Sequence, residues 1–191
     1  MTGLLLLAAG SSQRLGSPKQ LLTYKGKTLL NHCIDTALAS TAQPILVVLG
    51  ANFDEIYLTI PRVGIQVLNN TGWEEGMSSS VRLGIAELEK DPGIDSALIM
   101  LCDQPYVTSG LLEKLITAKD TTGKKIITCF FNDTYGPPAC FHRSLFNELS
   151  ELKGQNGAKS LIINHPREVV TINFPEGATD IDTKEDYFSL K

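Results

Sequence analysis

Runs of mostly hydrophobic residues recur along the chain and alternate with segments that carry a helical hydrophobic repeat. The runs span residues 4–7, 45–50, 65–68, 96–101 and 125–130. The helical repeats span residues 28–38, 52–58, 78–89 and 108–119. A strand that is hydrophobic at every position is typical of a parallel sheet that is covered on both faces. The alternation therefore predicts a three-layer α/β fold with a mostly parallel central sheet.

The alternation loosens only after Phe131. Residues 132–138 (NDTYGPP) are rich in turn formers, and we expect a loop or a hairpin there, which as one option covers the sheet edge as a substrate lid. A smaller hairpin turn is expected at Lys25-Gly26. The sequence contains no repeat, low-complexity tract or linker, so residues 1–191 are predicted to form a single domain.

The composition argues against several classes of partner. The 17 basic and 21 acidic residues give a net charge of −4, so neither nucleic acid nor a membrane surface is expected as a general partner. The N-terminal leucines are too few to span a membrane, and they lack the basic region and cleavage site of a signal peptide. No C-x-x-C pair is present, and we expect buried, reduced thiols of a cytoplasmic protein at Cys33, Cys102, Cys129 and Cys140. The three histidines are too scattered to suggest a metal site.

The segment from residue 4 to residue 19, LLLLAAGSSQRLGSPK, has the features of an anion-binding loop. Four leucines form a buried strand, and small residues follow whose backbone amides are accessible to phosphate oxygens. Arg14 and Lys19 come next and supply positive charge. The spacing matches neither a P-loop nor a dinucleotide-binding G-x-G-x-x-G motif, and an ordinary glycine turn is the simpler alternative.

Two other strands end in polar segments, and in parallel sheets such ends meet at one edge. Asp103 follows the run 97–101, where a carboxylate beside a triphosphate would hold Mg²⁺; capping of the turn before Pro105 is an equally good explanation. Ser78, Ser79 and Ser80 follow Gly76-Met77 at the start of a helix. They either cap that helix or present further amides and hydroxyls to a nucleotide.

These motifs resemble a known family. The signature LAAGxSxRxGxxK is matched in full by residues 7–19, and GMSSS (76–80), DQP (103–105), GPP (136–138), LKG with GAK (152–159) and DIDT (180–183) follow in the same order. The chain is similar, from about residue 7 to residue 186, to the molybdenum cofactor cytidylyltransferases and the related molybdopterin-guanine-dinucleotide-synthase-like nucleotidyltransferases.

The resemblance implies a Rossmann-like fold of the nucleotide-diphospho-sugar transferase type. It implies Mg²⁺-dependent transfer of CMP from CTP to the phosphate of molybdopterin, with a molybdenum hydroxylase as a possible client enzyme. Ala9 in the LAAG motif is associated with cytidine in this family. Arg14, Lys19 and Asp103 would be the catalytic residues, and Asp103 a metal ligand. The nucleotide would be bound by Leu7, Ala8, Ala9, Gly10, Ser11, Ser12, Arg14, Lys19, Ser78, Ser79 and Ser80.

The chain departs from the family pattern at Gln155, where the family usually has an aspartate in Gly-Asp-x-Gly. This difference concerns the acceptor end of the site more than the nucleotide end. Near the C-terminus, Asp182 and Glu185 form a D-x-x-E pattern, so Asp182 is expected to be a helix N-cap. Asp180 lies before that helix and is the preferred second metal ligand.

Three functions remain open from the sequence. The first is the cytidylyltransferase, and the second is a nucleotidyltransferase with another nucleotide or another small phosphorylated acceptor. The third is a non-catalytic carrier or insertion protein for the molybdenum cofactor. The combination of Arg14, Lys19 and Asp103 favours an enzyme, because a carrier has no need of a metal-bound triphosphate. An acceptor phosphate is already an anion, so no Ser, Cys or His nucleophile is required.

Overall fold

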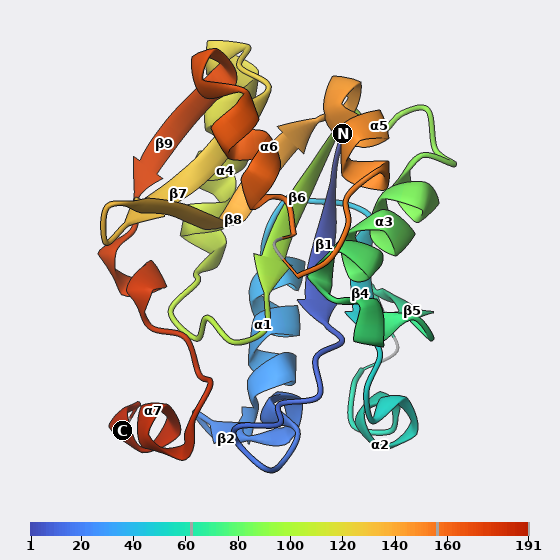
Figure 1. Cartoon of the computed structure of the whole chain (residues 1–191), viewed down its shortest axis with the longest axis vertical. Helices are drawn as coiled ribbons and strands as arrows, with labels where there is room; N and C mark the ends of the chain where they lie inside the picture. The colour runs from blue at the N-terminus through green and yellow to red at the C-terminus, as the bar shows by residue number, and fades with distance from the viewer. Residues whose placement is uncertain (62, 156, 191) are drawn as a thin grey trace.

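A seven-stranded sheet forms the centre of the computed structural model, which describes residues 1–61, 63–155 and 157–190 (Figure 1). Its strand order is β5-β4-β1-β6-β8-β7-β9, and β8 alone runs antiparallel to its neighbours. The strands are β1 (Thr2–Ala8), β4 (Ile45–Leu49), β5 (Gln66–Asn69), β6 (Ser96–Leu101), β7 (Ile126–Phe131), β8 (Thr134–His142) and β9 (Val169–Asn173). The prediction of a mostly parallel sheet is confirmed.

Helices cover both faces of this sheet (Figure 1). One face is covered by α1 (Leu29–Leu38), α2 (Phe53–Tyr57) and α4 (Ser109–Thr122). The other face is covered by α3 (Met77–Leu88), α5 (Phe146–Ser150) and α6 (Lys159–Asn164). Short 3-10 helices complete the connections: η1 (Lys19–Leu21), η2 (Trp73–Glu75), η3 (Arg143–Leu145), η4 (Pro166–Glu168) and η5 (Pro175–Ala178).

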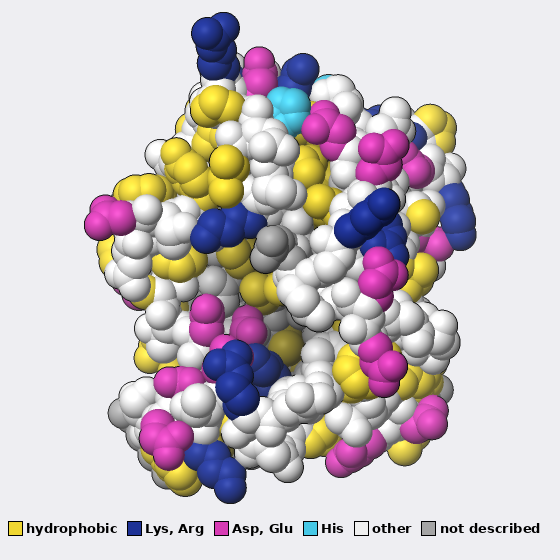
Figure 2. All heavy atoms as spheres, in the orientation of Figure 1, with side chains coloured by type: hydrophobic (Ala, Val, Ile, Leu, Met, Phe, Trp, Pro, Cys, Tyr) yellow, Lys and Arg dark blue, Asp and Glu magenta, His cyan; other side chains and the backbone are white. Residues whose placement is uncertain are grey.

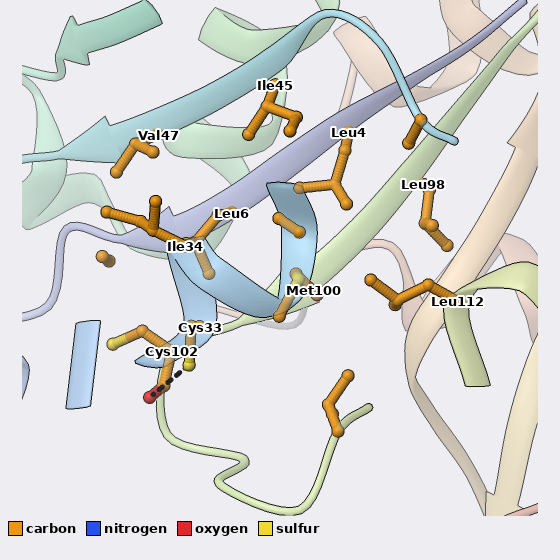
Figure 3. Close-up of a cluster of buried hydrophobic side chains, with 14 of the residues drawn as sticks. Leu4, Leu6, Cys33, Ile34, Ile45, Val47, Leu98, Met100, Cys102 and Leu112 are labelled. Carbon is orange, nitrogen blue, oxygen red and sulfur yellow. Dashed lines mark hydrogen bonds between the residues drawn. The ribbon is translucent and has the colours of Figure 1, made fainter. Parts of the chain in front are cut away.

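The central strand β1 shows why its sequence is mainly hydrophobic. All seven of its residues are buried, and successive side chains point to opposite faces of the sheet. Leu4 and Leu6 pack with α1 and α4, as Figure 3 shows for part of this layer, whereas Leu5 and Leu7 pack with α3 and α5. Three layers with two separate hydrophobic clusters result, as the sequence predicts.

The segment after Phe131 is a hairpin, and the lid interpretation is wrong. Residues 134–142 form β8, which lies between β6 and β7 inside the sheet. The hairpin turn consists of Asn132 and Asp133, with φ of 46° and 55°. Asn and Asp tolerate this left-handed region, which the tight turn of a hairpin requires. Residues 134–138 are therefore part of the sheet.

The C-terminal segment returns to the beginning of the chain. After β9 it passes through η5 to α7 (Lys184–Ser189), which lies beside the small hairpin of β2 (Thr23–Tyr24) and β3 (Lys27–Thr28) (Figure 1). The hydroxyl of Tyr187 donates to the carbonyl oxygen of Thr23 (2.9 Å). Ile181 is fully buried in a third cluster with Leu15. These contacts bring residues 180–182 next to the loop that follows β1.

The remaining sequence predictions on the fold can be checked directly. The four cysteines are free and buried, and burial raises the pKa of Cys33, Cys129 and Cys140 to about 12. Cys33 donates to the carbonyl oxygen of Cys102 (3.5 Å; Figure 3). Within the three described ranges, no helix has the length and apolar character that crossing a bilayer demands.

Candidate active site

A cleft of about 680 Å³ opens at the carboxyl ends of β1 and β6. Figure 2 shows it as a hollow with basic and acidic side chains gathered at one rim. Its volume lies within the range of small-molecule binding sites. The predicted site residues that line it are Leu7, Ala8, Ala9, Gly10, Ser11, Ser12, Arg14, Lys19, Ser80 and Asp103.

The loop after β1 is held in shape by its own side chains. Ser12 has a left-handed backbone (φ 55°), and its Oγ accepts a hydrogen bond from the backbone N–H of Lys19 (3.0 Å). The buried Gln20 donates through Nε2 to the carbonyl oxygens of Ala8 (2.7 Å) and Gly10 (2.9 Å). Since both carbonyl oxygens already accept hydrogen bonds from Gln20, the chain itself holds the loop conformation before any ligand binds. Gln20 is an unpredicted member of the site.

The charged end of the cleft is organised around Lys19. Its Nζ lies 3.0 Å from Oδ2 of Asp103 and 2.7 Å from Oδ1 of Asp182, while Arg14 contacts Oδ2 of Asp182 at 2.6 Å. The side chain of Lys19 is 13% exposed, whereas that of Arg14 is 73% exposed. Burial alone would lower the pKa of Lys19, but Asp103 and Asp182 outweigh it and raise that pKa. Lys19 is therefore a fixed positive charge.

Asp182 is a site residue, and the prediction that it caps the last helix is wrong. The N-cap of α7 is Thr183, one residue later, whose Oγ1 accepts from the backbone N–H of Asp186. The Asp186 carboxylate accepts in return from the Thr183 backbone N–H (2.8 Å), which completes a capping box. The Asp182 carboxylate is thus free to bind Lys19 and Arg14. The hydrogen bond from Lys19 holds the pKa of Asp182 below its usual value.

Single substitutions of Thr183 and of Asp182 separate these two roles. Thr183→Ala removes the cap of α7 and should therefore lower the free energy of unfolding by about 1 kcal/mol. The cleft should stay intact. Asp182→Asn should instead lower activity, because asparagine keeps the shape of the side chain but cannot balance the positive charges of Lys19 and Arg14. Urea denaturation and steady-state rates of both variants test this. If Asp182→Asn keeps full activity, Asp182 has no part in the site.

Asp103 has the features of a metal ligand. Its Oδ2 binds Lys19, while Oδ1 is buried and has no hydrogen-bond partner among the described residues. An unpaired buried carboxylate oxygen at the edge of a cleft fits a divalent cation that takes its remaining ligands from phosphate and water. The described part of the chain contains no group of three or more His, Cys, Asp or Glu side chains that could hold a metal ion alone.

Asp180 lies close to Asp103 but is not among the described residues that line the cleft. Burial, followed by the negative charges of Asp103 and Asp182, raises the pKa of Asp180 to about 6. The backbone N–H of the next residue, Ile181, donates to the carbonyl oxygen of Asp103 (3.1 Å). Asp180 thus lies within electrostatic reach of two carboxylates that line the cleft, and a cation there would relieve this repulsion.

The three predicted serines differ in position. Ser80 lines the cleft, whereas Ser78 and Ser79 are not among its described lining residues. Asn70 donates to Oγ of Ser79 (2.8 Å) and of Ser80 (2.9 Å), so both hydroxyls serve to join β5 to α3. Ser78 is fully buried, and its Oγ finds no partner within the described ranges. The α3 start presents Gly76, Met77 and Ser80 to the cleft.

The other wall of the cleft comes largely from the segment 69–76, which the sequence predicts to converge on the same sheet edge without singling out Trp73 or Glu74. It includes Trp73, Glu74 and Gln155, besides Gly76. Gly76 has φ +113°, and a side chain there would lie 2.7 Å from Cδ of Gln155. The backbone conformation therefore favours glycine, and the close approach places the end of the Gln155 side chain against the start of α3. The sequence signal for this wall is the Gly-rich link between β5 and α3.

Comparison with known proteins gives a family profile, a relative and solved structures that each cover most of the chain. The family profile described as "MobA-like NTP transferase domain" matches residues 4–169. A protein named nicotine blue oxidoreductase, from Paenarthrobacter nicotinovorans, is 28% identical over 196 residues, covering 97% of this chain and 94% of that protein. The crystal structure of a Mycobacterium tuberculosis Rv0371c homologue from Mycobacterium sp. strain JC1 superposes with a TM-score of 0.86 and 30% identity, covering 99% and 94% of the two chains. Rv0371c of strain H37Rv, solved in complex with manganese, gives 0.80 and 28%, covering 99% and 96%.

Proposed function

Because the chain belongs to the MobA-like NTP transferase family, we propose that it transfers CMP from CTP to the phosphate of molybdopterin and releases pyrophosphate. The observation that carries this proposal is Lys19, a largely buried cation that lies between Asp103 and Asp182 beside a loop of small residues. Nucleotidyl transfer needs positive charge beside the leaving pyrophosphate, and it needs a carboxylate that holds a metal cation there.

The residues of the chain would act by binding and by neutralising charge. Residues 9–12 line the cleft together with the cations Lys19 and Arg14, and backbone amides, lysine and arginine are groups that bind phosphate oxygens in other proteins. As the bond to the α-phosphorus breaks, negative charge grows on the leaving oxygens, where Lys19 and Arg14 would stabilise it. The acceptor phosphate attacks in line and needs no general base, because it is ionised at neutral pH.

Mg²⁺ is the proposed cofactor. Asp103 would hold it through the unpaired Oδ1, and Asp180 is the proposed second acidic residue beside it. When bound, the ion would supply further positive charge to the triphosphate. The manganese complex of the related Rv0371c supports a divalent ion in this fold.

CTP is the proposed nucleotide, and Ala9 is the residue proposed to select its base, cytosine. The Ala9 side chain lies at the tip of β1 and lines the cleft. A methyl group there leaves less room for a two-ring purine than for a one-ring pyrimidine. We expect CTP to be preferred over GTP by about 10–200-fold in kcat/KM, because one methyl group discriminates only this far. Ala9→Gly should narrow that difference.

Ala97→Gly is the matched control for this comparison, since the Ala97 side chain is fully buried in the core near the start of β6 and Ala97 is not among the residues that line the cleft. It should lower stability without changing the CTP-to-GTP ratio. Both ratios are measured with one acceptor. A wild-type preference for GTP would contradict the cytidine assignment, while nucleotidyl transfer itself would stand.

The acceptor end is proposed to lie beside Gln155, where this chain has a neutral amide in place of the family's usual aspartate. A molybdenum hydroxylase is the proposed client of the product. Incubation with each NTP, Mg²⁺ and molybdopterin, followed by mass identification of the product, tests the whole proposal. Pyrophosphate release with a different acceptor would support the second function named above. Binding of nucleotide-linked molybdopterin without pyrophosphate release would support a carrier.

A further inference from the structure

The cleft has two chemically different ends. The end at β6 carries Lys19, Arg14, Asp103 and Asp182, so it is strongly charged. The end nearer β4 is lined by Ala9 and Trp73 instead, and Glu74 and Met77, close to Trp73 in sequence, also line the cleft. Met77 is 38% exposed although it is a large hydrophobic residue, and exposed apolar side chains inside a cleft are a mark of ligand binding.

Trp73 is fixed at this apolar end by the main chain below it. A Cβ atom on Gly50, the residue that follows β4, would lie 2.6 Å from Cβ of Trp73, 2.9 Å from Cβ of Ala9 and 2.9 Å from the Ala9 carbonyl oxygen. Trp73 and Ala9 therefore rest on the same glycine and lie next to each other. The backbone N–H of Ala51 donates to the Ala9 carbonyl oxygen (3.0 Å), which joins the ends of β1 and β4.

The spacing of the two ends suits one nucleotide. The strands β4, β1 and β6 are consecutive neighbours in the sheet. Two strand spacings separate the tips of β4 and β6, or roughly 10 Å. A nucleotide whose phosphates reach Lys19 beyond β1 and β6 therefore extends its base across β1 toward Trp73. Among the described residues that line the cleft, the cations Lys19 and Arg14 belong to the charged end, whereas Glu74 next to Trp73 would repel a phosphate.

We infer that Trp73 is the aromatic wall against which the base of the nucleotide stacks, and that it sets the affinity for the base together with Ala9. This inference rests on the proposed function and adds a specificity-determining residue to it. An indole ring stacks on any base, so Trp73 provides affinity, while the neighbouring Ala9 methyl group limits the size of the ring system.

The chain provides its own probe, because Trp73 is its only tryptophan. Titration of the wild-type protein with CTP and Mg²⁺, without acceptor, should change the indole emission with saturation. Titration with inorganic tripolyphosphate and Mg²⁺ should leave that emission nearly unchanged, because this ligand has the phosphates and lacks the base. The pair of ligands therefore separates base contact from phosphate binding.

Two substitutions extend the test, with affinities measured by calorimetry. Trp73→Leu keeps an apolar side chain without a ring and should weaken CTP at least about tenfold, the usual size of a lost stacking contact. Trp73→Phe keeps a ring and should retain most of the affinity. Neither variant should change binding of tripolyphosphate, whereas Lys19→Met should weaken both ligands.

The outcomes are distinguishable. Wild-type emission that stays constant at saturating CTP, or CTP affinity that is unaffected in Trp73→Leu, overturns the inference. Equal weakening of CTP and tripolyphosphate in Trp73→Leu also overturns it, because Trp73 would then only shape the loop. A wild-type protein that binds neither CTP, GTP nor tripolyphosphate contradicts the proposed function itself.

Discussion

Asp103→Asn should lower the rate of pyrophosphate release by at least about 10²-fold while the protein stays folded. The substitution removes the charge from a side chain whose Oδ1 is buried and unpaired among the described residues. Asparagine keeps the shape of that side chain but is a poor ligand for a hard cation. Lys19 keeps Asp182 as a partner, so no buried charge is left alone and the fold should tolerate the change.

Two measurements check this prediction. The rate is determined with CTP, Mg²⁺ and acceptor, and Mn²⁺ affinity in the presence of CTP is followed by electron paramagnetic resonance. Asp120→Asn is the matched control, because Asp120 pairs with Lys119 on α4, away from the cleft. It should leave both quantities unchanged. Normal Mn²⁺ affinity in Asp103→Asn would remove Asp103 from the metal site.

The architecture was predictable from the sequence where the strands are buried on both faces. The strands β1, β4 and β6 are mostly hydrophobic because helices cover both sides of the sheet, and this pattern is visible locally in the sequence. The strand β9 was not predicted, since it lies at the sheet edge and is partly exposed. The strand β8 was not predicted as a strand of the central sheet, because its residues Gly136, Pro137 and Pro138 are typical of a loop.

The site was predictable where it is local in sequence. The loop from Ala8 to Lys19 is determined by short-range contacts such as Ser12 Oγ with the Lys19 N–H, and its signature is therefore compact. Asp182 could not be assigned in the same way. The patterns D-x-x-E from Asp182 and T-x-x-D from Thr183 both suit a helix start, one residue apart. The choice depends on Lys19, 163 residues earlier in the chain, which binds the Asp182 carboxylate.

Lys19→Met should reduce kcat by about 10²-fold, and Arg14→Met should have a clearly smaller effect. The two cations stand in the same loop, but their surroundings differ. Lys19 is 13% exposed and contacts both Asp103 and Asp182, so water screens its charge only weakly. Arg14 is 73% exposed and pairs with one carboxylate, that of Asp182, among the described residues, so solvent screens most of its field.

Kinetic constants for CTP at saturating acceptor test this order, with Lys90→Met as the control. Lys90 is an exposed lysine that pairs with Glu87 at the end of α3, so its loss should change neither kcat nor KM. Salt adds a second criterion, because the contribution of Arg14 should decrease at higher ionic strength while that of Lys19 persists. Equal losses in the two variants would mean that burial does not rank these cations. Wild-type kinetics in both would mean that the loop is a structural turn and that phosphate binds elsewhere.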